Sequence, residues 1–151
     1  MIKISVNNLV EPISKNYLPL LKAPKVYLIG GLLIITTGLY HFLDPTLQPH
    51  MNTLGVTPSQ VNWILLSRNF SMSISAIIIG WIIYRWKNIN KLEIISIGHL
   101  IYFISYLLLG PSSLLPIEPN VWLSVMSVEL IGIAFSVSDI PTFEIMLKIA
   151  M

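Results

Sequence analysis

The sequence contains no cysteine and few charged residues. Without cysteine, the chain can form no disulfide framework, no thiolate nucleophile and no cysteine-ligated metal site. Charged residues make up only 11% of the 151 residues, whereas soluble domains carry about 25%. The formal net charge of +2 is too small to indicate a nucleic-acid partner. The composition therefore excludes disulfide-stapled and nucleic-acid-binding proteins.

Catalytic and metal-binding motifs are also absent. The sequence has no G-x-S-x-G, no H-E-x-x-H, no P-loop and no pair of carboxylates within one helical turn that would suit acid–base catalysis. Its three histidines lack the spacing of a zinc site, which needs two ligands on one turn and a third nearby. We therefore predict that the chain is not an enzyme and binds neither a metal nor a cofactor.

Apolar sequence is abundant, because 54% of the residues are hydrophobic. A soluble domain of this size leaves too much of its surface in water to bury so many apolar side chains. Four segments, residues 26–51, 61–84, 92–109 and 121–147, each supply about the 20 apolar residues that a helix needs to cross a bilayer. The strict alternation of a β-barrel strand does not persist in any of them. We predict an all-α membrane protein with four transmembrane helices.

Basic residues outside these segments lie on one side of the predicted bundle. Four precede the first segment, three lie between the second and third, and Lys148 follows the fourth. The two loops on the opposite side contain no lysine or arginine. Because cytosolic loops accumulate basic residues, both termini are predicted to face the cytosol. Residues 1–25 lack the features of a signal peptide and are predicted to form a cytosolic lead-in.

Ionisable side chains inside apolar segments are the strongest functional signal, because each is costly to insert into a membrane. Helical spacing places several of them on polar faces that would meet inside a bundle. For Asp44, Arg68 and Glu129, we favour a role in lining a cavity over a role in structural ion pairs. Three separated charges of mixed sign are unusual in a purely structural bundle. The candidate binding residues are Tyr40, His41, Asp44, Arg68, Glu129 and Asp139.

Arg68 is predicted to pair with an acidic group from another segment, because an unpaired guanidinium at its depth is unfavourable. Asp44 is the leading candidate, since the first segment ends on the side where the second begins. Glu129 is the alternative partner, because depth alone does not exclude it.

Other polar residues have a packing explanation. Ser67, Ser71 and Ser75 recur at the four-residue spacing typical of closely packed membrane helices. His99 is predicted to be a hydrogen-bonded packing residue rather than a proton carrier.

Several short elements, taken in order along the chain, resemble a known family. They are FLDPTLQPHM at the end of the first segment, Gly80 and Arg85 at the end of the second, YLLLGP at the end of the third, and DIPTFEIM in the fourth. No single element is specific, but their order from about Leu20 to the end resembles the carboxy-terminal half of a major facilitator superfamily transporter. The most similar branch is that of the vesicular amine and polyamine transporters.

The resemblance implies that the four segments correspond to helices seven to ten of a transporter that exchanges organic cations for protons at a midplane site. Asp44 and Pro45 resemble the acidic residue and proline of helix seven, and the helix is expected to continue past this proline with a kink. Asp139 matches an acidic residue late in helix ten. An aspartate that often follows Gly80 by four residues is missing, because Tyr84 stands there. The gating or structural residues implied by the resemblance are Pro45, Gly80, Arg85, Gly110, Pro111 and Pro141.

The sequence therefore predicts proton-coupled transport of an amine or polyamine by a fragment or short form of such a transporter, a partial half-bundle in which Asp44 and Asp139 face the cation. Expected partners are the lipid bilayer, a small organic cation, a proton, and a full-length transporter or missing half. The expected location is a vesicle or another organelle membrane. The alternative is a non-transporting interaction protein that associates with full-length transporters through two small-residue faces, one of Ser67, Ser71 and Ser75 and one of Ala76 and Gly80. A third hypothesis is a small self-assembled channel.

Overall fold

The computed structural model describes residues 24–86, 88–110 and 120–150. Within these ranges the chain forms four long helices and no strand: α2 (Pro24–Thr53), α3 (Pro58–Arg85), α4 (Lys91–Leu109) and α5 (Val121–Ala150). All four are long and apolar enough to cross a membrane, which confirms the predicted all-α fold. The predicted segments fall inside these helices. α2 begins earlier than predicted, at Pro24, because proline is tolerated in the first turn of a helix.

Two helices continue through internal prolines. Pro45 lies within α2 and Pro141 within α5. A proline removes one backbone hydrogen bond of the helix. Ending the helix there would leave more backbone groups unpaired, and the membrane interior has no water to satisfy them. Beside each proline a threonine hydroxyl donates to the carbonyl one turn back, Thr46 at 2.8 Å and Thr142 at 2.6 Å. The expected continuation of the first helix past Pro45 is therefore confirmed.

Polar residues define where α3 and α4 begin. Thr57 is the N-cap of α3, and its backbone N–H donates to Gln60 Oε1 at 2.9 Å. Asn90 caps α4 by accepting a hydrogen bond from the Leu92 N–H at 3.2 Å. Gly55, with φ of +79°, allows the tight turn between α2 and α3, since this conformation is unfavourable for other residues. These local signals fix the antiparallel order of the helices.

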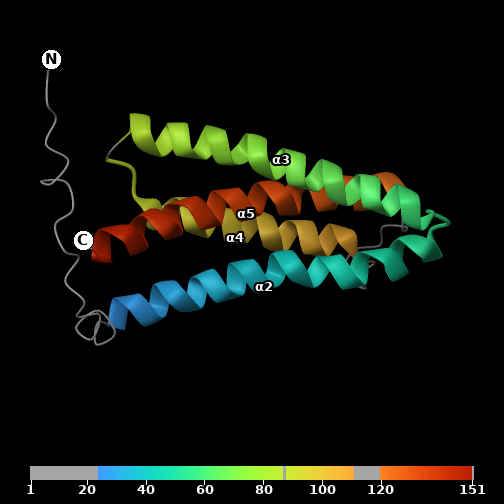
Figure 1. Ribbon diagram of the computed structural model, residues 1–151, viewed down its shortest axis with the longest axis horizontal. Coiled ribbons are helices and arrows are strands. Elements are labelled where there is room, and N and C mark those ends of the chain that lie inside the picture. Colours follow the sequence, from blue (N-terminus) through green and yellow to red (C-terminus); the bar gives the residue numbers. More distant parts are fainter. Residues whose placement is uncertain (1–23, 87, 111–119, 151) are drawn as a thin grey trace, which may run out of the picture.

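The centre of the bundle is α5, which packs against α4, α3 and α2 (Figure 1). Half of its apolar stretch is buried within the bundle, compared with 6% for α3. α3 therefore packs against α5 with one side, and the rest of the surface of α3 is exposed. The buried hydrophobic core comprises Tyr40, Leu43, Leu47, Met51, Val61, Tyr102, Val128, Ile131 and Ala134.

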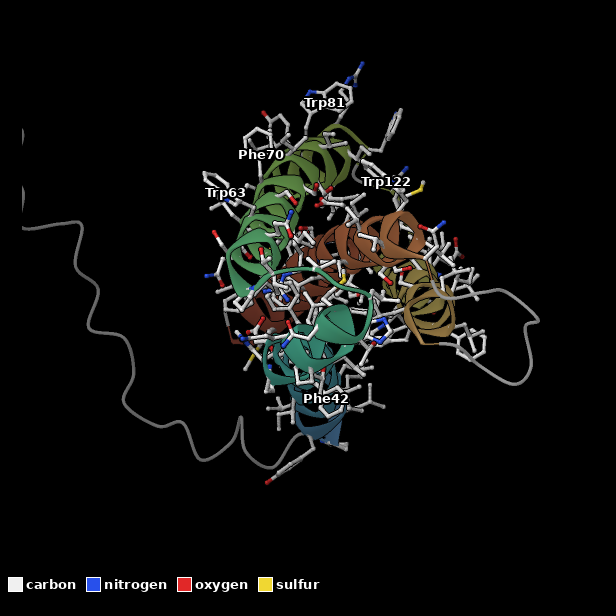
Figure 2. All side chains as sticks on the ribbon, turned by 90° about the vertical axis from the view of Figure 1, so that its right-hand side faces the viewer. Phe42, Trp63, Phe70, Trp81 and Trp122 are labelled. Carbon is white, nitrogen blue, oxygen red and sulfur yellow. The ribbon has the colours of Figure 1, made fainter. Side chains whose placement is uncertain are left out.

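The outer surface carries large apolar side chains. Phe42 on α2 and Trp63, Phe70 and Trp81 on α3 point away from the bundle (Figure 2) and are 60% to 69% exposed. An apolar surface of this kind is unusual for a monomeric soluble protein and suits contact with lipid. Four apolar helices with such an exterior support an integral, multi-pass membrane protein.

Candidate functional site

Arg68, on α3, is buried in the bundle with only 3% of its surface exposed. Its Nη2 donates to Oδ1 of Asp44, on α2, at 2.8 Å. Its Nη1 lies 3.5 Å from the carbonyl oxygen of Tyr40, and its Cζ lies 4.1 Å from the centroid of the Tyr40 ring. The ion pair, the backbone contact and the cation–π contact offset part of the cost of burying the guanidinium. Its Nε is buried without a hydrogen-bond partner among the described residues. The predicted pairing of Arg68 with Asp44 is confirmed.

The carboxylate of Asp44 is shared between two side chains. Oδ1 contacts Arg68, and Oδ2 lies 3.3 Å from Nδ1 of His41, one turn earlier on α2. The Asp44 side chain is 41% exposed and that of His41 is 64% exposed. Asp44 therefore reaches the bundle surface while its arginine partner is enclosed. A cation that approaches Asp44 must compete with Arg68 for the same carboxylate.

Tyr40 connects α2 to both α3 and α5. Its hydroxyl donates to Oδ1 of Asn69 at 2.6 Å, and its ring packs against Phe135 with the ring centroids 4.5 Å apart. Sequence reasoning did not assign Asn69 to the site. An uncharged amide in an apolar segment beside Arg68 is the signal that would have indicated it, because such a group requires a hydrogen-bond partner in a membrane.

Glu129, on α5, is hydrogen-bonded to hydroxyl groups. Ser67 and Ser71, on α3, each donate to one of its two carboxylate oxygens. The two serines are four residues apart and so lie on one helical face. Within residues 24–86, 88–110 and 120–150, no basic side chain lies within ion-pair distance of Glu129. In this part of the chain Glu129 is therefore hydrogen-bonded to hydroxyl groups, whereas Asp44 is ion-paired with Arg68.

Beside this carboxylate, α3 and α5 approach each other closely. A Cβ added to Gly132 would lie 2.6 Å from the carbonyl oxygen of Arg68 and 3.2 Å from its Cγ. One turn further, the Ser136 hydroxyl donates to the carbonyl of Met72 at 2.7 Å. The side of α5 that carries Glu129, Gly132 and Ser136 therefore faces α3. This close crossing positions Glu129 at the depth of Arg68.

Asp139 is a second half-buried carboxylate on α5. It lies ten residues beyond Glu129, which corresponds to about 15 Å along the helix. In the described part of the chain, no hydrogen bond or ion pair joins it to another side chain. Within the described ranges, α5 thus presents two carboxylates, those of Glu129 and Asp139, without an ion-pair partner.

The polar side chains of α4 form hydrogen bonds to α2. His99 Nε2 lies 3.3 Å from the Thr36 hydroxyl of α2, and its Nδ1 lies 2.9 Å from the carbonyl of Ile95. The hydroxyls of Tyr102 and Tyr106 donate to backbone carbonyls of α2. His99 therefore forms the interhelical hydrogen bond expected of a packing residue.

The predicted gating and structural residues are spread over the bundle. Pro45 is exposed on α2, whereas Pro141 is buried in α5. Arg85 is the last residue of α3, and Gly110 is the C-cap of α4. Pro111 lies outside the described residues. These residues therefore do not form one site.

A second charged cluster was not predicted from the sequence. Oε1 of Glu144, on α5, bonds to Nζ of Lys91 on α4 and lies 3.3 Å from Nζ of Lys148. The spacing of Glu144 and Lys148 is that of a helical ion pair and is the signal that would have indicated it. A cleft between α3 and α5 is lined by these three charged residues and by Gly80, one of the predicted gating residues.

Comparison with known proteins identifies related transporters. The chain is 32% identical to MFS-type transporter SLC18B1 of Rattus norvegicus over 137 residues, or 90% of this chain. It is 31% identical to the Mus musculus protein of the same name over 141 residues, and 29% identical to the Homo sapiens protein. No family model and no solved structure matches the chain. The chain spans about 30% of the length of these curated relatives. The resemblance predicted from the ordered sequence elements is confirmed.

Proposed function

Because the chain is homologous to part of an MFS-type transporter, we propose that it contributes to the transport of small organic cations, amines or polyamines, in exchange for protons. The chain corresponds to about 30% of its relatives' length. In this proposal, the other helices around the cavity come from further transporter sequence or from a full-length partner. Transport takes place across a vesicle or other organelle membrane, and both termini face the cytosol.

The proposal rests on the side-chain partners of the two carboxylates on α5, Glu129 and Asp139. Glu129 is bonded to two serine hydroxyls, and Asp139 has no side-chain partner in the ranges that the structure describes. A carboxylate that is partly buried without a countercharge attracts cations. Because the two lie about 15 Å apart along α5, a linear polyamine matches them better than a compact monoamine.

Asp44 has a different role in this proposal. The sequence predicts that it faces the cation, but its two oxygens lie beside Arg68 and His41. This geometry favours Asp44 as the counter-ion that allows Arg68 to lie inside the bundle. Direct contact with the transported cation is then assigned to Glu129 and Asp139.

The test uses a chimera in which this chain replaces the matching segment of the rat transporter. Uptake of radiolabelled spermidine is measured in proteoliposomes with an acidic lumen. We expect uptake that depends on the pH gradient and that falls to the level of empty liposomes in Glu129→Gln, because the neutral amide cannot exchange a proton. The matched control is Glu93→Gln, which neutralises an exposed carboxylate at the start of α4.

Two results would contradict the proposal. One is a chimera that elutes as a single folded species but transports no cation. The other is full gradient-driven uptake by Glu129→Gln, since the carboxylate would then have no part in exchange.

The alternative function, a non-transporting interaction protein, has less support. Its predicted contact faces are formed by Ser67, Ser71 and Ser75 and by Ala76 and Gly80. Two of the serines, Ser67 and Ser71, are bonded to Glu129 on α5 of the same chain. They therefore serve contacts between α3 and α5 rather than contacts with a partner.

A further inference from the structure

A cleft of about 530 Å³ opens between α3 and α5 near the end of the bundle where both helices end. Figure 1 shows α3 diverging from α5 towards this end. The walls of the cleft are formed mainly by the apolar side chains of Ile83, Ile140, Phe143 and Leu147. This lining suits a hydrocarbon chain rather than a polar solute.

The cleft also has a cationic rim. Lys91 and Lys148 both contact the carboxylate of Glu144, so two positive charges face one negative charge. The Lys148 side chain is 62% exposed and free to contact a second anion. The rim therefore carries a net positive charge beside an apolar wall.

Aromatic side chains indicate where this cleft lies relative to a bilayer. Trp81 and Tyr84 lie in the last two turns of α3, Trp86 is its C-cap, and the three side chains are 54% to 78% exposed. Tryptophan and tyrosine are enriched at the membrane–water interface, at the depth of lipid headgroups. The rim of the cleft is thus at headgroup depth, and its apolar wall extends towards the hydrocarbon region.

We propose that this cleft binds an anionic phospholipid. The phosphate contacts the exposed ammonium group of Lys148, and an acyl chain lies along the apolar wall. The buried ammonium group of Lys91 adds positive charge nearby without touching the lipid. A second copy of the chain fits this place poorly. In a parallel pair the same ends of two copies would meet. Among the described residues, Lys25, Arg85, Lys91 and Lys148 outnumber Glu93 and Glu144 at this end, so two net positive charges would repel each other. The proposal concerns lipid binding alone and does not depend on the transport function.

The test compares phosphatidylglycerol with phosphatidylcholine of the same acyl chains, added to the full chain in detergent and counted as adducts by native mass spectrometry. We expect preferential retention of phosphatidylglycerol. Each lysine near an anionic headgroup strengthens binding about fivefold, so Lys91→Gln with Lys148→Gln is expected to remove most of the preference. The matched control is Lys25→Gln with Arg85→Gln, two charges at the same end that do not line the cleft.

Glu144→Gln is an independent test, because its expected effect on lipid retention is opposite to that of the lysine substitutions. It removes the negative charge from the rim and is expected to increase retention of phosphatidylglycerol. If the cluster only stabilises the fold, this variant should reduce retention instead.

The proposal is overturned by equal retention of the two lipids, by an equal loss in the control variant, or by reduced retention in Glu144→Gln. It is also overturned if inorganic phosphate alone displaces the lipid at equimolar concentration, because the apolar wall would then contribute nothing.

Discussion

Asp44→Asn is expected to lower the free energy of unfolding by about 3 kcal/mol, because it leaves a buried guanidinium without its counter-ion. The effect should be unequal for the two partners. Arg68 is 3% exposed, whereas the Asp44 side chain is 41% exposed and can be solvated on its outer side. Arg68→Met should therefore lower stability by only about 1 kcal/mol, since the methionine keeps most of the apolar stem. Unfolding in SDS micelles measures both values.

The double variant, Asp44→Asn with Arg68→Met, tests whether these effects are coupled. We expect it to be more stable than Asp44→Asn alone, because the buried charge has been removed along with its partner. Arg85→Met, which removes an exposed arginine from the end of α3, is the control and should change little. Equal and additive losses in the two single variants would show that the ion pair does not stabilise the bundle.

Gly132→Ala is expected to destabilise the protein by about 2 kcal/mol, because α3 and α5 have no room for another carbon where they cross. The added Cβ would lie 2.6 Å from the carbonyl oxygen of Arg68, and both atoms belong to helices that are already packed. Separating the two helices would also weaken the contacts that Ser67 and Ser71 make with Glu129. The shift of the SDS-unfolding midpoint measures this loss.

Gly38→Ala is the matched control for the same substitution. No atom lies within 4 Å of a Cβ added there. Alanine is favoured over glycine in a helix, so Gly38→Ala should raise stability by about 0.5 kcal/mol. If both variants change stability in the same direction, the helices do not cross as closely as described.

The predictable part of the fold follows from the properties of the bilayer. Residues 61–84 could be assigned to a membrane helix because their apolar run is long enough to span a membrane, and α3 contains them. The pairing of Arg68 with Asp44 was predictable because a buried charge in a membrane needs a partner and the two helices are joined by a short turn. Length, burial and chain connectivity were sufficient for these inferences.

The parts that sequence reasoning missed depend on which helices become neighbours. All four helices are apolar, and lipid is as favourable a neighbour for leucine as another helix is. Hydrophobicity therefore does not indicate that α5 is central or that α3 is the most exposed. The contacts of Glu129 with Ser67 and Ser71, and of Lys91 with Glu144, join segments far apart in the chain. A single sequence gives no distance between them.

The assignment of the intramembrane carboxylates is tested most directly by gradient-driven spermidine uptake in the chimera that carries Asp44→Asn with Arg68→Met. Neutralising both members of the pair removes the Asp44 carboxylate without leaving a buried charge. If Glu129 and Asp139 contact the cation and Asp44 only balances Arg68, this variant should retain uptake, in contrast to Glu129→Gln. Loss of uptake in a correctly folded double variant, with uptake retained in Glu129→Gln, would contradict the assignment and identify Asp44 as the residue that faces the cation.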